Sequence, residues 1–174
     1  NNILDDIFLA RNNGAYISAL SLALTLPNIL SNIEFNRKTA RKEYVDWFNK
    51  FASDYDGIIH INISAEFSSC HQNACLAAEE LDNVRVVDSQ NLSTGQGHVV
   101  LEACRLAKTC ESLDEIADKL NAFVPKVEAS FLLDQLKYMV KGGRCSSAAA
   151  LGANLLNLKP CIEVRDGKMS VVKK

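Results

Sequence analysis

The sequence predicts an α/β protein in which a parallel sheet, covered by helices on both faces, packs against a smaller domain with a mixed sheet. Two observations predict the first domain: β-branched runs at 58–63 and 84–87 each lead through a polar loop into a helical pattern. The second domain is predicted by Asp166-Gly167, which stands between two strand-like runs and signals a hairpin. We place the parallel domain at residues 1–110 and part of the mixed domain at 111–174.

Two elements are predicted before the first of these strands. Residues 15–26 alternate small and large apolar side chains, which indicates a buried strand that ends at Pro27. This stretch is too short and too polar to span a bilayer, so no stable membrane insertion is expected. Residues 37–53 predict an amphipathic helix, because aromatic side chains at i, i+3, i+4 and i+7 form one stripe: Tyr44, Trp47, Phe48 and Phe51.

The strand at 58–63 leads into a serine-containing loop at 64–69 and then into a helix that extends to about residue 81. Ser69 and Gln72 have the spacing of a capping box. A helix N-terminus that faces the carboxyl end of a strand can hold an anion, because its free N–H groups point outward and serine hydroxyls add donors. The alternative is an ordinary turn in which the serines only cap the helix.

The strand at 84–87 is followed by a loop with Gly95 and Gly97 and by a helix at 98–107. This is only part of a dinucleotide fingerprint, because Val100 stands where the third glycine would be. A tight turn is therefore favoured over a nucleotide site.

The remaining elements belong mostly to the second domain. Ser112 and Glu115 form a capping box that opens a helix to about Phe123. A strand, a short helix ended by two glycines, a small-residue helix and two strands follow, at 127–133, 134–140, 146–154, 159–164 and 169–172.

Composition and charge exclude several classes of protein. The chain has 174 residues, is 48% hydrophobic and carries a net charge of −2. That apolar content supports a real core, and a sequence without a strongly basic face argues against nucleic acid as a partner. Six cysteines without a C-x-x-C pair, and three histidines at unrelated spacings, argue against a metal site. A core of this size needs no disulfides, so a reducing cytoplasm is expected.

Three stretches, in this order and spacing, resemble the DegV family of bacterial lipid-binding proteins. The first is the strand and serine loop INISAEFSSCHQNA at 61–74, and the second is VVDS at 86–89 with STGQG at 93–97. The third and most specific comprises LDQLKY at 133–138, KGGR at 141–144, LLNLKP at 155–160 and Asp166-Gly167. The resemblance covers roughly residues 36 to 174.

The resemblance implies a two-domain fold with a long-chain fatty acid in a tunnel between the domains. A serine and a threonine near the domain junction would hold the carboxylate. Such proteins are not themselves enzymes and need no cofactor beyond the bound fatty acid. They present it to a separate fatty acid kinase, which phosphorylates the carboxylate for lipid metabolism. The rival reading is an enzyme with Ser68 and His71, or Cys70 and Asp88, as nucleophile and helper. It is disfavoured because Ser68 and His71 are too close in the chain for a triad and the sequence has no G-x-S-x-G elbow.

Matching residues to the family identifies the candidate ligand-binding positions. The family's serine-glycine-threonine stands here as Ser68-Ser69-Cys70, so Ser68 takes the place of the serine. The threonine falls on Asn36 in an ungapped count and on Thr39 if three residues are missing. Arg144 follows two glycines, and its guanidinium can bind a carboxylate or phosphate through two parallel hydrogen bonds.

The sequence also departs from the family at both ends. The first strand of the family and the helices expected after residue 174 are not seen, so we expect a chain truncated at both ends. The substitutions around Ser68 and the open choice of threonine leave one alternative function, a regulatory or interaction module with a degenerate ligand site.

Overall fold

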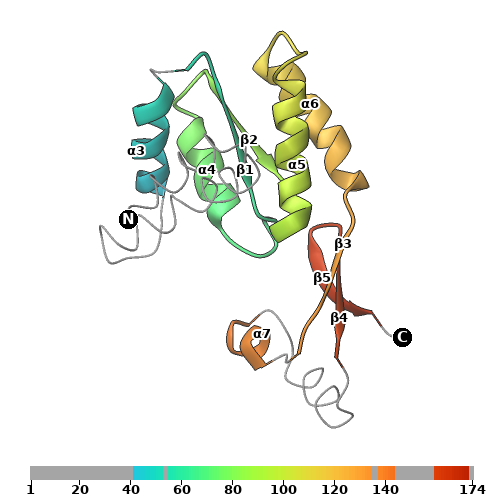
Figure 1. Cartoon of the computed structure of the whole chain (residues 1–174). Coiled ribbons are helices and arrows are strands. Elements are labelled where there is room, and N and C mark those ends of the chain that lie inside the picture. Colours follow the sequence, from blue (N-terminus) through green and yellow to red (C-terminus); the bar gives the residue numbers. More distant parts are fainter. Residues whose placement is uncertain (1–40, 53–54, 135–136, 144–158, 173–174) are drawn as a thin grey trace, which may run out of the picture.

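The computed structural model describes residues 41–52, 55–134, 137–143 and 159–172. They form a two-stranded parallel sheet flanked by helices and a three-stranded antiparallel sheet beside it (Figure 1). This confirms the predicted mixed α/β class. The strand predicted at 15–26 and the small-residue helix predicted at 146–154 lie outside the described residues.

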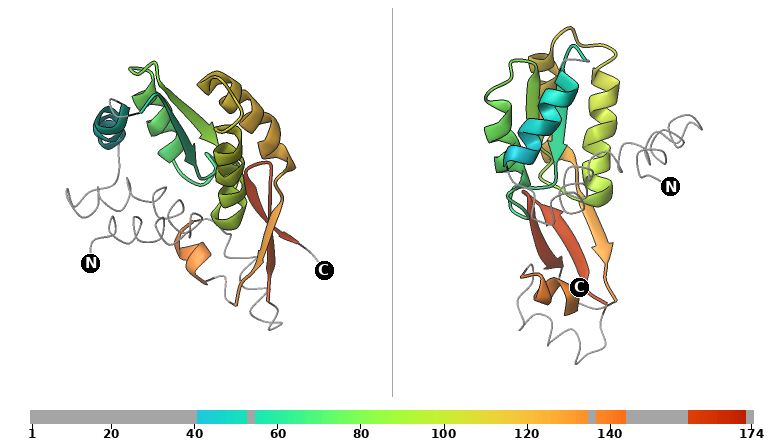
Figure 2. Two further views of the ribbon diagram at one scale, coloured as in Figure 1. Left: turned by 45° about the horizontal axis from the view of Figure 1, so that its top comes forward. Right: turned by 90° about the vertical axis from the view of Figure 1, so that its left-hand side faces the viewer.

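The parallel sheet pairs β1, Ile58–Asn62, with β2, Val84–Asp88, in a register that sets Asn62 opposite Asp88. Helices α3, Arg41–Ala52, and α4, Cys70–Ala78, cover one face, while α5, Ser93–Leu106, and α6, Leu113–Phe123, cover the other (Figures 1 and 2). Strand, helix, strand, helix is the order that the two β-branched runs predict, and buried parallel strands of this kind require helices on both faces.

Alternation along the two strands divides their side chains between two cores. Ile61 and Val87 point toward α5 and α6 and are almost fully buried there, whereas Val84 points toward α3 and α4. The first core also includes side chains from both helices and the turn after α6: Val99, Val100, Leu106, Ile116, Leu120 and Val124.

The predicted aromatic stripe of α3 is divided between the core and the surface. Tyr44 and Phe48 are buried against α4 and the sheet, with ring centroids 6.0 Å apart. Trp47 and Phe51 are half-buried instead and stack on each other at 5.0 Å, and the ammonium group of Lys50 lies over both rings. The stripe therefore anchors the helix through only two of its four aromatic residues.

The predicted capping box at Ser69 is wrong. Helix α4 begins at Cys70, and the Ser69 side chain makes no capping hydrogen bond. The hydroxyl that accepts from the first turn is Ser68 Oγ, which receives the Cys70 N–H at 3.2 Å. The loop enters the helix one residue out of phase with a capping box, so the preceding serine satisfies the free donor.

The glycine-containing loop after β2 is also shorter than predicted. Helix α5 begins at Ser93, so Gly95 and Gly97 lie in its first turns rather than in a loop. A Cβ at Gly95 would overlap the side chain of Asn91, which is buried beside it. Gly95 therefore allows close packing of Asn91 against the helix, and neither glycine belongs to a phosphate-binding loop.

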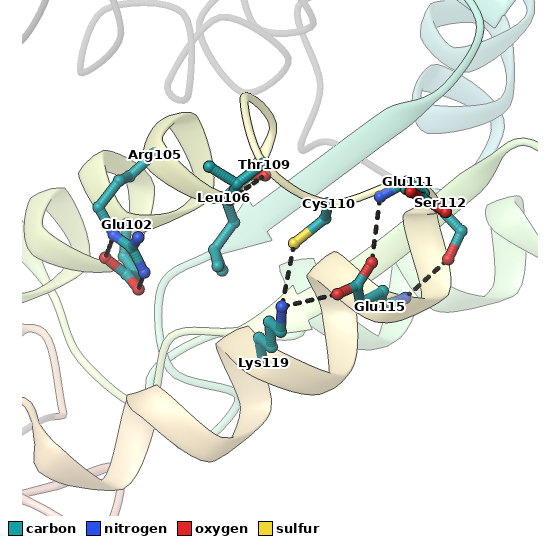
Figure 3. Close-up of polar contacts among 9 residues, drawn as sticks. All are labelled: Glu102, Arg105, Leu106, Thr109, Cys110, Glu111, Ser112, Glu115 and Lys119. Atoms are coloured by element: carbon teal, nitrogen blue, oxygen red, sulfur yellow. Dashed lines mark hydrogen bonds and ion pairs between the residues drawn. The ribbon is translucent and has the colours of Figure 1, made fainter.

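The capping box at Ser112 is confirmed. Ser112 Oγ accepts from the Glu115 N–H at 3.2 Å, and the Glu115 carboxylate accepts from the Glu111 N–H at 3.0 Å and pairs with Lys119 (Figure 3). The helix that it opens packs through Ile116 and Leu120 on the parallel sheet. The division of the chain at residue 110 remains a prediction, but α6 shares its core with the parallel sheet.

The antiparallel sheet has the order β3, Ala129–Leu132, then β4, Cys161–Arg165, then β5, Lys168–Val172. A single turn of 3-10 helix, Val124–Lys126, leads into it from α6. Its inner face buries Ile162 and Val164, with the short helix α7, Lys137–Lys141, on that side. The hairpin turn has positive φ at Asp166, 51°, and at Gly167, 75°. Two positive φ values at the central residues are what an Asp-Gly hairpin predicts.

The hairpin turn joins the two sheets. Ser64, at the carboxyl end of β1, is fully buried, and its hydroxyl donates to the Gly167 carbonyl at 2.7 Å. A Cβ at Gly167 would lie 2.8 Å from Ser64 Oγ, closer than real Cβ atoms approach. Only glycine therefore satisfies both the backbone conformation and the close contact at this position.

We predict that Gly167→Ala destabilises the protein by about 1–3 kcal/mol, because it combines an unfavourable φ with a contact that must move. Gly97→Ala is a matched control: it lies in α5 with open space around its Cβ position, so alanine should be neutral or stabilise by up to about 1 kcal/mol. Urea unfolding followed by circular dichroism measures both. Equal midpoints for Gly167→Ala and the wild type would show that the turn does not hold the sheets together.

Candidate ligand-binding site

The carboxyl ends of β1 and β2 lie at the same edge of the parallel sheet, where ligands of open α/β sheets bind. Two loops leave this edge, 63–69 after β1 and 89–92 after β2, and the 166–167 hairpin turn lies against the first. The candidate site is built from these three segments. Its framework is hydrogen-bonded through buried polar side chains, which fix the backbone on which Ser68 stands.

Asp88 fastens the two loops together. Its carboxylate oxygens accept from the Ala65 N–H at 3.3 Å, and Oδ1 also accepts from the Gln90 N–H at 2.8 Å. The Ser64 N–H in turn donates to the Asn91 carbonyl at 2.9 Å. The carboxylate of Asp88 is thus used to shape the loops.

A second set of hydrogen bonds holds the loop after β2 in place. The Asn91 side chain donates to the Val127 carbonyl at 3.1 Å, where the chain leaves for the antiparallel sheet, and accepts from the Leu92 N–H. Ser89 Oγ accepts from the Asn91 N–H at 3.2 Å. Gln96, on α5, donates to the Ile61 carbonyl at 3.0 Å inside the core. These bonds leave the loop little freedom to move independently of the sheet.

Ser68 stands at the end of the first loop, two residues before α4 begins. Its hydroxyl donates to Cys70 Sγ at 2.9 Å and accepts from the Cys70 N–H. Ser69 is exposed at the start of the helix and its hydroxyl makes no capping bond. Of the two predicted serines, Ser68 is therefore the one that the fold holds in a defined orientation.

An open pocket of about 430 Å³ lies where the first loop meets the antiparallel sheet. It is lined by Glu66 and Phe67 from the loop, by Gly143 after α7, and by Lys168 and Met169 from β5. Lys168 Nζ lies 3.8 Å from a Glu66 carboxylate oxygen, so an ion pair spans the two sheets at its rim. Its volume falls in the range of about 300–1,000 Å³ common for small-molecule sites.

Three of the five predicted site residues lie outside the described residues: Asn36, Thr39 and Arg144. Their roles stay predictions. Gly143, the residue before Arg144 in the chain, lines the pocket, and its φ of 71° is one that glycine readily adopts. The roles of Ser68 and Ser69 toward a ligand also stay predictions, although the structure places both in the loop beside this pocket.

The sequence did not predict that Ser64, Asp88 and Asn91 hold the loops in place. Asp88 is the last residue of β2, and Ser64 and Asn91 follow the ends of β1 and β2. Short polar side chains in such positions commonly bond to nearby backbone. That pattern was a usable signal for Asp88. Nothing local in the sequence connects Ser64 with Gly167, because the two residues are 103 positions apart.

Behind the loop, a polar group is buried between α3 and β1. The hydroxyl of Tyr44 hydrogen-bonds Cys70 and Asn62, and burial raises its pKa further above its usual value. Asn62 contacts His60 Nε2 at 3.0 Å, and its Oδ1 is buried without a hydrogen-bond partner. The His60 ring lies edge-on to Tyr44 and Phe48. Burial, with a smaller contribution from nearby His71, lowers the pKa of His60 to about 4.

His71, on the first turn of α4, contacts another side chain of the same helix. Its Nε2 lies 3.4 Å from Cys75 Sγ, and its Nδ1 is buried without a partner. Among the described residues, no three side chains of His, Cys, Asp or Glu gather in a way that could hold a metal ion. The same residues include no helix that is both long and apolar enough to cross a bilayer.

Comparisons with known proteins agree on one family. The family model for DegV, whose description reads "Uncharacterised protein, DegV family", matches residues 32–174. A DegV domain-containing protein from Clostridium acetobutylicum is 37% identical over 132 residues, which are 75% of this chain and 47% of that protein. The chain thus spans about half the length of the curated relatives it matches.

Solved structures show the same likeness. A DegV family protein from Thermus thermophilus, described by its fatty acid binding, is 28% identical with a TM-score of 0.67, over 78% of this chain and 49% of that one. A fatty acid-binding DegV family protein from Streptococcus agalactiae is 28% identical with a TM-score of 0.66, over 78% and 50%. The expected two-domain fold is therefore confirmed.

The low pKa of His60 predicts a pH dependence of stability. In the unfolded chain a histidine takes up its proton near pH 6.5, whereas His60 in the folded protein does so only near pH 4. Between these values the unfolded state binds more protons, so the free energy of unfolding falls as the pH falls from about 6.5 to 4.

His60→Phe keeps an aromatic ring and removes the titrating group, so it should flatten this slope relative to the wild type. The matched control is His98→Gln, because His98 is exposed on α5 and should leave the slope unchanged. Urea unfolding at a series of pH values measures the difference, and parallel pH curves for His60→Phe and the wild type would contradict it.

Proposed function

This chain belongs to the DegV family, and we propose on that premise that it binds a long-chain fatty acid at the junction of its two sheets. One observation carries the proposal: a pocket opens between the serine loop and the antiparallel sheet, at the carboxyl edge of the parallel strands. The relatives named above that are described as fatty acid-binding share this fold.

The two ends of a fatty acid need different surroundings. The acyl chain needs apolar walls, and the carboxylate needs two or three convergent donors at one end. Phe67 and Met169 provide apolar surface in the pocket, and Ser68 stands in the same loop as Phe67 at the N-terminus of α4. A hydroxyl beside the positive end of a helix dipole favours a bound anion. We propose that Ser68 donates a hydrogen bond to the ligand carboxylate, with Asn36 or Thr39 as the second donor.

We also propose that the protein is a carrier that hands the bound carboxylate to a separate fatty acid kinase and does not itself catalyse the reaction. The contacts of the candidate nucleophile support this reading. Ser68 donates to a thiol, His71 faces Cys75, and Asp88 braces two loops, so these groups do not form a nucleophile–base–orienter series. The phosphoryl chemistry would then belong to the partner.

The bacterial cytoplasm is the proposed compartment. The organisms of the relatives above are bacteria. Five cysteines within the described residues are not in disulfides, namely Cys70, Cys75, Cys104, Cys110 and Cys161. Cysteines outside disulfides are typical of a reducing compartment. Cys104 is exposed and Cys75 half-buried, so neither serves as a fully buried core residue.

We predict that the full-length protein purifies with a C14–C18 fatty acid, or takes one up in near-stoichiometric amount when it is supplied. Ser68→Ala should lose about 1.5–3 kcal/mol of binding free energy, because it removes a hydrogen bond to a charged group. Ser69→Ala is the matched control and should bind like the wild type. The measurements are chromatography of extracted lipid and displacement of a fluorescent fatty acid.

Protein that carries no fatty acid after feeding would refute the proposed function and favour an interaction module. Normal binding with equal affinities for Ser68→Ala and the wild type would remove only Ser68 from the site.

A second prediction concerns Arg144, which follows the pocket residue Gly143. Arg144→Ala should reduce acyl-phosphate formation in an assay coupled to the kinase, because the guanidinium is suited to a phosphate or carboxylate. Arg144→Lys should recover only part of the rate, since lysine cannot make the bidentate fork. If Arg144→Ala supports the kinase at the wild-type rate and binds fatty acid equally well, the arginine has no part in the site.

A further inference from the structure

The hydroxyl of Ser68 is held at both of its hydrogen-bonding functions by one residue. The Cys70 N–H donates to Ser68 Oγ at 3.2 Å, and Ser68 Oγ donates to Cys70 Sγ at 2.9 Å. A serine hydroxyl has a single proton. Together the two bonds hold the side chain in one orientation, and the thiol fixes where the proton points.

Cys70 is itself fixed from the side opposite the loop. It packs among the side chains of the core between α3, α4 and the sheet. The buried Tyr44 hydroxyl hydrogen-bonds it, and Tyr44 also bonds Asn62 at the end of β1. The sulfur therefore belongs to a hydrogen-bonded series that starts in the buried core and ends at Ser68.

We propose that Cys70 is a positioning residue that acts through Ser68 on the ligand carboxylate. The Cys70 thiol keeps the Ser68 hydroxyl in one rotamer, and when the ligand arrives the hydroxyl turns its proton from the sulfur to a carboxylate oxygen. This inference rests on the proposed function. Sulfur is a weak acceptor, whereas a bond to a carboxylate is charge-assisted and roughly twice as strong as a neutral one. The exchange of acceptor therefore favours the ligand and needs no movement of the loop, because Ser68 keeps its bond from the Cys70 N–H.

Without the thiol, only the bond from the Cys70 N–H at 3.2 Å would hold the Ser68 side chain, which could then also take rotamers that point to water. Binding would then have to reorder it, and that cost would appear as lost affinity. We expect Cys70→Ala to bind palmitate about three- to tenfold more weakly, the factor that corresponds to ordering one side chain on binding. Cys70→Ser should recover most of the affinity, because its hydroxyl can accept the same proton and can still bond Tyr44.

The experiment measures palmitate and hexadecanol binding to the full-length wild type, Cys70→Ala, Cys70→Ser, Ser68→Ala and the Ser68→Ala/Cys70→Ala double variant. A positioning role predicts that Cys70→Ala weakens palmitate much more than hexadecanol, which lacks the carboxylate. It also predicts that Cys70→Ala has no further effect once Ser68 is alanine. The matched control is Cys75→Ala, one turn further along α4, where the sulfur contacts His71.

Three outcomes would overturn the inference while leaving fatty acid binding intact: equal palmitate affinity for Cys70→Ala and wild type, an equal loss for both ligands, or losses that add in the double variant. Equal losses or additive losses would mean that Cys70 acts through packing alone. Because Cys70→Ala also removes a partner of a buried phenol, thermal unfolding checks that each variant is folded, and Cys70→Ser keeps the comparison valid if alanine is not tolerated. A wild type that binds neither ligand would refute the proposed function itself.

Discussion

The arrangement of the protein depends on one buried contact, the hydrogen bond from the Ser64 hydroxyl to the Gly167 carbonyl. Because Ser64 is fully buried, an unpaired hydroxyl there would be costly, and the hairpin turn supplies its partner. The turn can approach closely enough only because Gly167 has no side chain and accepts a positive φ. The antiparallel sheet is thereby fixed at the carboxyl edge of the parallel strands, and the pocket lies where the two meet.

The parts of the fold that could be predicted are those set by neighbours in sequence. The Asp166-Gly167 hairpin and the cap at Ser112 each depend on a few adjacent residues, and both were correct. The predicted starts of α4 and α5 were wrong, because these starts depend on contacts with residues outside the predicted helix. Asn91 packs against Gly95, which lies within α5 and not in a loop before it. At α4, Ser68 and not Ser69 accepts the N–H of Cys70.

The same distinction, between features set by neighbours in sequence and features set by distant contacts, holds for the candidate site. Its place could be predicted, since a serine loop after a strand and before a helix identifies the carboxyl edge of the sheet. The partners of its side chains could not be predicted. The framework residues Ser64 and Asp88 bond across loops, and Tyr44 reaches Cys70 from a different helix. Such bonds depend on how elements pack in three dimensions, which the local pattern of the sequence does not record.

Within the part of the chain that the structure describes, hydrogen bonds from Ser64 to Gly167 and from Asn91 to Val127 join the parallel-sheet domain to the segments that form the other sheet. Rotation of one half against the other about the line through both bonds would stretch neither of them, whereas other rotations would break at least one. The Glu66–Lys168 ion pair adds a third, longer link at the pocket rim, where both partners are largely exposed. Exposed pairs of this kind contribute little, so the Glu66–Lys168 pair adds little resistance to a rotation that leaves both hydrogen bonds intact.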